Sequence, residues 1–168
     1  MIVKRRLTIF VPTLERGGAE RVAVNLANYF SSKNYIVTLV CYRSIGEFKD
    51  TLNKNVIIKD LNISRTRYGV FKVALYLNRS SDDIYLSVSQ DFNVLACLAN
   101  IACRKKNLII REASTAHNLT GLNKIKQWAY FKLLRTAYSQ AQLLICNSKD
   151  TAQSYVNARV ICRKNTTV

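Results

Sequence analysis

Acidic residues are scarce in this sequence. Ten Asp and Glu stand against 26 Lys and Arg, which gives a formal net charge of +16. A balance this basic favours an anionic partner, and nucleic acid, anionic lipid headgroups and phosphorylated substrates all qualify. A solvated basic face remains the alternative, because sequence charge alone does not identify a partner. The excess is largest from residue 101 onward, where only Glu112 and Asp150 are acidic.

Long apolar runs and a disulfide or metal framework are also missing. The longest apolar segment, Val94 to Ala102, is interrupted by Asn100 and is far shorter than the ~20 residues of a spanning helix. The N-terminus lacks the cleavage site of a signal peptide. We therefore expect a cytoplasmic protein whose membrane contact, if any, is peripheral. The cysteines never form a C-x-x-C pair and favour reduced core residues over a disulfide frame or a zinc site. They are Cys41, Cys97, Cys103, Cys146 and Cys162.

Two common nucleotide-binding motifs are absent. No stretch has the G-x-G-x-x-G spacing of a dinucleotide site, and none has the G-x-x-x-x-G-K-[S/T] spacing of a Walker A loop. The expected second strand ends at Arg43 without an acidic residue for a ribose hydroxyl. Signatures of RRM, KH and helix-turn-helix modules are missing as well, which counts against nucleic acid as the partner.

Expected strands alternate with expected helices along the chain. Several strands are apolar on both faces, which predicts an α/β fold: a Rossmann-like, doubly wound, mostly parallel sheet with helices on both faces. The length suits one domain over residues 1–168. The strands are expected at 7–11, 36–42, 56–61, 84–88, 107–111 and 143–146, with 159–162 as a candidate seventh. The helices are expected at 19–32, 68–79, 92–103, 122–139 and 149–156, and Asp91, Asn123 and Ser148 are their candidate N-caps.

Ligands of such sheets bind beyond the carboxyl ends of the strands. The loops expected there are 13–18, 43–46, 89–93, 111–121 and 147–148. In the first of them, Gly17 and Gly18 stand at the mouth of a helix, where free N–H groups and the helix dipole favour an anion. A tight strand-to-helix turn explains the two glycines equally well.

Two segments carry a resemblance to a known family. The string Glu15-Arg-Gly-Gly-Ala-Glu-Arg21, with the helix and strand after it, resembles the N-terminal domain of the family 4 retaining glycosyltransferases. The segment Gln142-Leu-Leu-Ile-Cys-Asn-Ser148 resembles a later strand of that family, which ends in Asn-Ser beside the interdomain cleft. The resemblance covers nearly the whole chain.

The resemblance implies the N-terminal half of a GT-B fold. The acceptor is then held by this domain and a nucleotide-sugar donor mainly by a second one, whose E-x7-E glutamates should follow Val168 and do not. The chain is thus expected to be the acceptor-side domain, with the C-terminal donor-binding domain absent and no activity on its own. Transfer in this family retains the anomeric configuration and needs neither a cofactor nor a metal. Its members commonly build bacterial lipopolysaccharide or other surface polysaccharide.

The resemblance also suggests roles for particular residues. The glycine loop, with Gly17, Gly18 and Glu20, is expected near the donor diphosphate; Glu20 alternatively only complements the helix dipole. Arg111 and Glu112 end a strand. Arg111 could contact a phosphate and Glu112 could act as a catalytic carboxylate; alternatively, the two residues only form an exposed ion pair. The remaining candidates have simpler alternatives. His117 is either a catalytic or sugar-contacting residue or an exposed loop histidine, and Asn147 and Ser148 either bind donor or acceptor or only cap a helix.

The expected helix at 122–139 mixes basic and aromatic residues. Such a helix can lie on an anionic membrane, or it can pack one face on the core and leave a basic side in water. The membrane-contact candidates are Lys124, Lys126, Trp128, Lys132 and Arg135.

Taken together, these features predict a domain that takes part in sugar transfer from a nucleotide sugar to a bacterial surface-polysaccharide or lipid-linked acceptor. The domain is expected in the cytoplasm, at the inner face of the plasma membrane. A basic α/β binding module for nucleic acid or an anionic membrane surface is the alternative.

Overall fold

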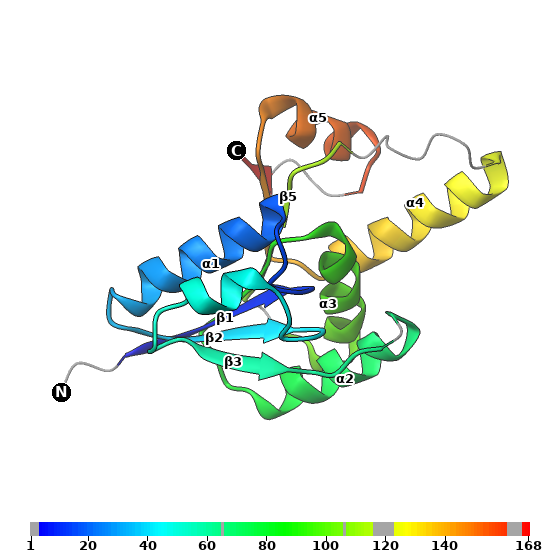
Figure 1. Cartoon of the computed structure of the whole chain (residues 1–168). Helices are drawn as coiled ribbons and strands as arrows, with labels where there is room; N and C mark the ends of the chain where they lie inside the picture. Colours follow the sequence, from blue (N-terminus) through cyan, green and yellow to red (C-terminus); the bar gives the residue numbers. More distant parts are fainter. Residues whose placement is uncertain (1–3, 65, 106, 116–122, 161–165) are drawn as a thin grey trace.

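The computed structural model describes residues 4–64, 66–105, 107–115, 123–160 and 166–168. They form one parallel sheet with helices on both faces (Figure 1). The elements in chain order are β1 (Arg5–Val11), α1 (Gly18–Ser31), β2 (Tyr35–Cys41), the short 3₁₀ helix η1 (Glu47–Thr51), β3 (Ile57–Asp60), α2 (Thr66–Arg79), β4 (Ile84–Ser87), α3 (Gln90–Cys103), β5 (Leu108–Glu112), α4 (Lys124–Tyr138), β6 (Leu143–Cys146), α5 (Lys149–Asn157) and β7 (Thr166–Thr167).

The sheet order is β3-β2-β1-β4-β5-β6-β7, and every described strand pair is parallel. This confirms the predicted fold class. The chain builds outward from β1 to β3, then crosses through α2 to β4 on the other side of β1. The order therefore reverses between β1 and β4, the kind of position at which doubly wound sheets bind ligands.

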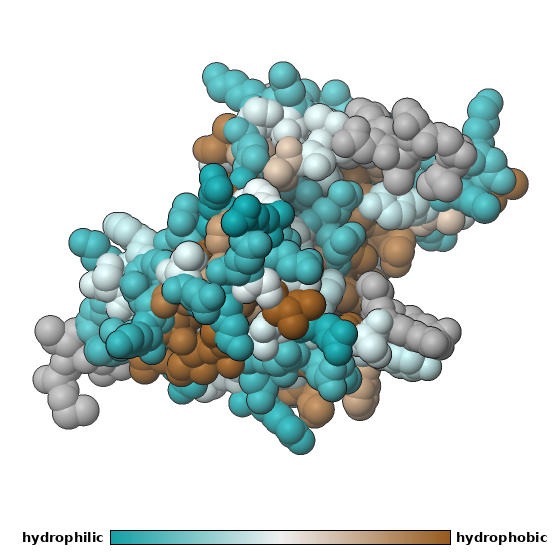
Figure 2. Space-filling view, in the orientation of Figure 1, coloured by the Kyte–Doolittle hydropathy of each residue, from teal (hydrophilic) through white to brown (hydrophobic). Residues whose placement is uncertain are grey.

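The sheet has a hydrophobic core on each face, and β1 contributes side chains to both. Leu7, Ile9 and Val11 pack with α1 on one face, whereas Phe10 packs with α2 and α3 on the other. This alternation follows from the two-residue period of a strand. Of the four cysteines within the described residues, Cys41, Cys97 and Cys146 are buried, and all four carry free thiols. Figure 2 shows a mostly hydrophilic surface on the visible side, interrupted by an apolar patch over β2 and β3.

Most predicted elements agree with the structure to within two or three residues. The caps at Asn123 and Ser148 are confirmed, because their side chains accept hydrogen bonds from the backbone N–H groups of Lys126 and Thr151. The cap at Asp91 is wrong: α3 starts one residue before Asp91, and Ser89 takes the N-cap position.

The candidate seventh strand at 159–162 is also misplaced. Arg159 has a φ of +54° and donates its backbone N–H to Val156, and Val160 donates to Tyr155, so these residues form the turn that ends α5. Residues 161 and 162 lie outside the described residues. The seventh strand is β7, which pairs with β6 through Leu144 and Ile145. The sequence also did not predict η1.

Candidate functional site

The glycine loop leaves the carboxyl end of β1 and opens α1. Gly17 is the N-cap residue in extended backbone, with φ −154° and ψ 163°, and no side chain caps the helix. Its carbonyl accepts the first helical hydrogen bond, from the Arg21 N–H at 3.0 Å. The first N–H groups of α1 therefore point toward a ligand position, with the positive end of the helix dipole behind them.

A surface cavity of about 610 Å³ lies at this helix mouth. Its lining comes from the glycine loop, the first turn of α1 and η1. Arg16 forms an ion pair with Glu47, and the Arg21 guanidinium lies 6.0 Å from the centroid of the Phe48 ring. The lining residues are Arg16, Gly17, Gly18, Arg21, Glu47, Phe48 and Thr51. A helix N-terminus with two arginines in a cavity of this size suits a phosphate or diphosphate group.

Glu20 folds back over the same helix mouth. A Cβ atom added at Gly17 would lie 2.0 Å from the Glu20 Oε2 atom, so the carboxylate occupies the space beside the Gly17 Cα. Beside Gly18, by contrast, no atom lies within 4 Å of an added Cβ. Glu20 thus places a negative charge where α1 attracts one, and a bound phosphate would compete with it.

A second loop holds the glycine loop in place. The Leu14 N–H donates to the Ile45 carbonyl at 2.8 Å, and the Phe48 N–H donates to the Leu14 carbonyl at 2.9 Å. Between these contacts, Gly46 has a φ of +122°, and an added Cβ would lie 2.1 Å from the Leu14 carbonyl carbon. Only glycine fits there. Gly46 was expected in a ligand loop, and its supporting role was not predicted, because the contact with Leu14 joins two loops that lie far apart in the sequence.

The ends of β5 and β6 bring two predicted residues together. Arg111 donates from Nη2 to the Asn147 Oδ1 atom at 2.5 Å. The Asn147 N–H also donates to the Glu112 carbonyl at 3.2 Å, as expected for neighbouring parallel strands. Ser148 is occupied as the cap of α5, whereas both Arg111 and Asn147 remain at the carboxyl edge. A guanidinium in this position can contact a phosphate oxygen.

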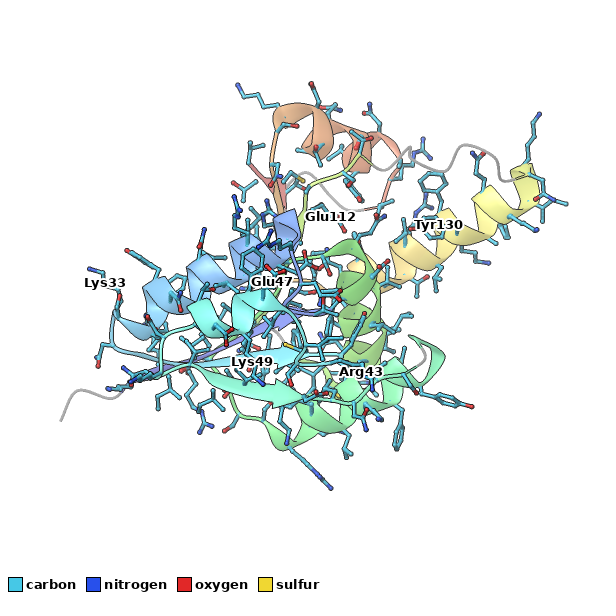
Figure 3. The ribbon with its side chains drawn as sticks, viewed as in Figure 1. Lys33, Arg43, Glu47, Lys49, Glu112 and Tyr130 are labelled. Atoms are coloured by element: carbon cyan, nitrogen blue, oxygen red, sulfur yellow. The ribbon has the colours of Figure 1, made fainter. Side chains whose placement is uncertain are left out.

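Glu112 does not form the exposed ion pair that the sequence allowed. Its side chain lies where β5 ends, among other side chains (Figure 3), and the residue is 1% exposed. Tyr138 donates its hydroxyl to Glu112 Oε1, and Asn93 donates its amide to the same oxygen at 2.8 Å. Burial raises the pKa of Glu112, and these hydrogen bonds lower it in part. The carboxylate faces the core, so its catalytic role stays a prediction. His117 lies outside the described residues.

Buried polar atoms gather near the point where the strand order reverses. Within the described residues, Ser87 Oγ, Ser89 Oγ, Asn93 Oδ1 and Tyr42 OH are buried without a hydrogen-bond partner. They come from the end of β4, the start of α3 and the residue after β2. Buried polar groups normally find partners, so this region is suited to ligand hydroxyls or ordered water. In the sequence, this cluster was signalled only by the expected ligand loop at 89–93.

The membrane-contact candidates are all exposed residues of α4, which extends away from the rest of the domain (Figure 1). Trp128 is 64% exposed and Ile125 is 77% exposed, and the Lys132 ammonium lies 4.9 Å from the centroid of the Trp128 ring. The opposite side of the helix packs on the core through Leu134, Ala137 and Tyr138. The helix therefore packs one side on the core and leaves a basic and aromatic side exposed, and membrane contact stays a prediction.

The described residues contain no group of three or more His, Cys, Asp or Glu side chains that could hold a metal ion. None of the helices formed by the described part of the chain is long and apolar enough to cross a membrane.

The fold and the candidate site define a class: a doubly wound α/β domain with a cavity at the mouth of its first helix. The sequence profile of Glycosyltransferase Family 4 matches residues 16–168, and the chain belongs to that family. No curated protein sequence matches the chain significantly.

Solved structures show the same fold at low sequence identity. The lipopolysaccharide outer core galactosyltransferase WaaB, in its apo form, superposes with a TM-score of 0.63 at 17% identity, over 98% of this chain and 44% of WaaB. An α-glucosyltransferase in complex with UDP and a 13-mer DNA superposes with a TM-score of 0.54 at 14% identity, over 92% of this chain and 39% of that one. The chain thus spans less than half the length of these two glycosyltransferases.

Proposed function

We propose that this chain forms the acceptor-side half of a glycosyltransferase that transfers a sugar from a nucleotide-sugar donor. The observation that carries the proposal is the cavity at the mouth of α1, lined by Gly17, Gly18, Arg16 and Arg21, in a chain of family 4. As the bond between sugar and diphosphate breaks, negative charge grows on the leaving oxygen. Helix N–H groups fixed in place stabilise that charge without reorganising, and Arg16 and Arg21 add positive charge beside them.

The acceptor in this proposal lies at the carboxyl ends of β1 and β4, beside the buried polar atoms described above. Sugar hydroxyls both donate and accept hydrogen bonds, so they match unpaired atoms such as Ser87 Oγ and Asn93 Oδ1. Glu112 positions Asn93, because its carboxylate accepts a hydrogen bond from the Asn93 amide on the core side. Arg111 and Asn147 contact the donor from the neighbouring strand ends. We expect the α1 N-terminus and the arginines, without a metal ion, to balance the diphosphate charge.

The test is transfer by a protein that contains both halves. Gly17→Val and Gly18→Val should each lower kcat/KM by about 100-fold, because they close the approach to the helix N–H groups. Both variants should fold, since the Gly17 side chain would displace only the flexible end of Glu20 and Gly18 faces open space. Lys33→Val, beyond the other end of α1 (Figure 3), is the control. Wild-type turnover by both glycine variants would refute the site.

A second part of the proposal is that the 168-residue chain alone transfers no sugar, because it spans less than half the length of the two glycosyltransferases on which it superposes. Purified chain, nucleotide sugars and a panel of acceptors supply the test. Nucleotide release coupled to product formation by the chain alone contradicts this part and leaves the glycine-loop site untouched.

We further propose that α4 binds anionic membrane at the cytoplasmic face of the bacterial plasma membrane, where a lipid-linked or surface-polysaccharide acceptor is found. The similarity to WaaB and the exposed basic and aromatic side of α4 support this. The five candidates are Lys124, Lys126, Trp128, Lys132 and Arg135.

Vesicle sedimentation at low salt tests the membrane proposal. Phosphatidylglycerol-containing vesicles should bind the chain better than phosphatidylcholine vesicles, and Trp128→Ala/Lys132→Gln should weaken binding by about tenfold. Tyr29→Ala/Lys33→Gln is a matched control, because Lys33 lies 5.8 Å from the Tyr29 ring centroid on α1. Equal partitioning into both vesicle types would remove the membrane proposal.

Nucleic acid remains the competing partner, since the chain carries +16 and one similar structure holds DNA. DNA that displaces the chain from anionic vesicles, with steeply salt-dependent affinity, would favour it.

A further inference from the structure

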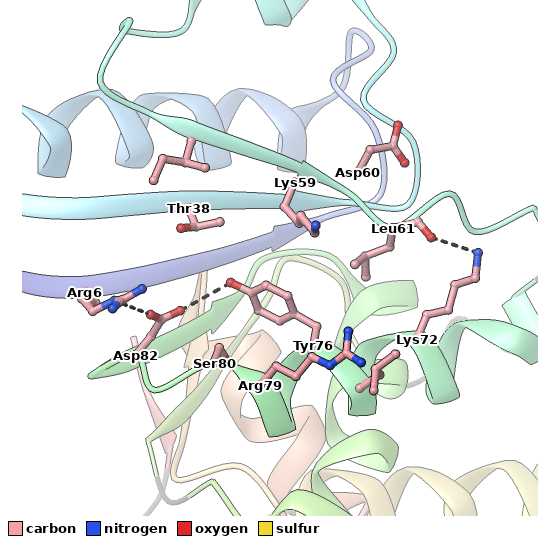
Figure 4. Close-up of a pocket in the computed structure, with 12 residues that line it drawn as sticks. Arg6, Thr38, Lys59, Asp60, Leu61, Lys72, Tyr76, Arg79, Ser80 and Asp82 are labelled. Carbon is pink, nitrogen blue, oxygen red and sulfur yellow. Dashed lines mark hydrogen bonds and ion pairs between the residues drawn. The ribbon is translucent and has the colours of Figure 1, made fainter.

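A second cavity lies on the opposite face of the sheet from the glycine-loop cavity. It has a volume of about 620 Å³ and runs between β3 and α2 (Figure 4). The fold explains the opening. The connection from β2 to β3 is η1, which packs beside α1 on the other face, whereas α2 packs mainly on α3. On the α2 face, β2 and β3 therefore have no helix of their own within the described residues.

Four cationic side chains from three elements line this cavity: Arg6 from β1, Lys59 from β3, and Lys72 and Arg79 from α2. Arg6 is partly neutralised, because its Nε lies 3.0 Å from the buried Asp82 carboxylate. Lys72 donates to the Leu61 carbonyl at 3.0 Å and keeps its charge. Lys59 and Arg79 have no hydrogen-bond or ion-pair partner in the part of the chain that the structure describes. Figure 4 shows both of them directed into the space between β3 and α2.

The two carboxylates of the lining are already engaged. Asp82 accepts from Arg6 and from the Thr8 hydroxyl, at 2.5 Å for the latter. Asp60 accepts from the Ser44 backbone N–H at 2.8 Å, on the loop after β2. Neither carboxylate pairs with Lys59 or Arg79, so the free charge of the cavity is positive.

Aliphatic side chains also line the cavity, together with Thr38, Tyr76 and Ser80. Ile57 on β3 is 52% exposed and Leu75 on α2 is 40% exposed, which is high for side chains of this type. One helical turn before Leu75, Phe71 is 74% exposed on the same side of α2. An apolar strip thus leads along α2 into the cavity and ends beside the unpaired cations.

We propose that this cavity binds an anionic amphiphile: a phosphate monoester whose headgroup lies between Lys59 and Arg79 and whose alkyl chain covers Leu75 and Phe71. Charge complementarity and the apolar strip together select this class over a free anion or a neutral detergent. The site is independent of the sugar-transfer proposal, because it shares no residue with the glycine-loop cavity.

The experiment is an NMR titration of the isotopically labelled 168-residue chain with monooctyl phosphate, below its micelle-forming concentration. Inorganic phosphate and octyl maltoside are the parallel probes. Shift changes should map to β3 and α2, and octyl phosphate should bind at least about tenfold more tightly than inorganic phosphate, since each buried methylene adds about threefold to fourfold.

Two variants separate the headgroup from the chain. Lys59→Gln/Arg79→Gln should weaken octyl phosphate binding by about tenfold. Leu75→Ser should weaken octyl phosphate binding and leave inorganic phosphate binding unchanged. The control Lys33→Gln/Lys54→Gln removes two exposed charges elsewhere and should change neither.

Three outcomes would overturn the proposal. Equal weakening by the control pair would mean general attraction to the basic chain. Equal affinity for inorganic phosphate would mean a plain anion site that serves free phosphate and no lipid. Equal affinity for octyl maltoside would mean an apolar surface without a headgroup site.

Discussion

Replacing Gly46 tests how the glycine loop is held. In Gly46→Ala, the new side chain must adopt a φ near +122°, which costs about 1–3 kcal/mol outside glycine. Its Cβ would also lie about 2 Å from the Leu14 backbone, which must therefore shift. That shift weakens the hydrogen bonds that join Leu14 to Ile45 and Phe48, at about 0.5–1.5 kcal/mol each. Together these effects predict a loss of about 3 kcal/mol in the free energy of unfolding.

The assay is thermal and urea unfolding followed by circular dichroism. For a chain of this length, 3 kcal/mol lowers Tm by about 6–12 °C. The matched control is Gly18→Ala, whose Cβ would meet no atom within 4 Å and which lies in the first turn of α1. It should leave Tm unchanged or raise it slightly, because alanine restricts the unfolded chain and favours the helix. If Gly46→Ala is as stable as Gly18→Ala, the supporting role of Gly46 is wrong.

Three further predictions follow from the described contacts. Because burial raises the pKa of Glu112, its contribution to stability is complete below the unfolded value of about 4.5 and is lost as pH rises through the folded value. Glu112→Gln should therefore flatten the pH dependence of the urea midpoint above pH 5; an unchanged slope would contradict this. Ser148→Ala and Asn123→Ala should each lower the free energy of unfolding by about 1 kcal/mol, measured by urea unfolding, and no loss in either would mean that these caps do not stabilise α5 and α4. Glu20→Gln should strengthen binding of pyrophosphate to the chain several-fold by calorimetry, because it removes a competing carboxylate; weaker binding would mean that Glu20 helps to hold the ligand.

The strands and helices of the sheet could be predicted from the sequence because the patterns that indicate them are local. Apolar runs of four to seven residues and helical periodicity depend only on neighbouring positions, so β1 and α1 could be predicted within two residues. Local signals also misled. The apolar run that begins at Val160 predicted a strand, yet the backbone of Arg159 and Val160 closes α5. The 3₁₀ helix η1 has five residues and no apolar period to detect.

Site geometry depended on residues far apart in the chain. A glutamate at a strand end is usually exposed. The burial of Glu112 needs Asn93 from α3 and Tyr138 from α4, and no local pattern predicts that meeting. The cavity between β3 and α2 depends likewise on the packing of α2 against α3, which no local pattern predicts. The pairing of Arg111 with Asn147 was within reach, because adjacent parallel strands end at one edge.

Under the proposed function, the Glu20 carboxylate occupies the place of the donor diphosphate when no donor is bound. Without a donor, the Glu20 carboxylate screens the α1 N-terminus. Because it is attached to the chain, its local concentration is very high, and free phosphate must compete with it. A diphosphate carries more charge than the carboxylate and can also engage Arg16 and Arg21, which line the same cavity. We therefore expect the helix mouth to exchange its occupant for polyvalent anions in preference to monovalent ones, with Glu20 setting the threshold for that exchange.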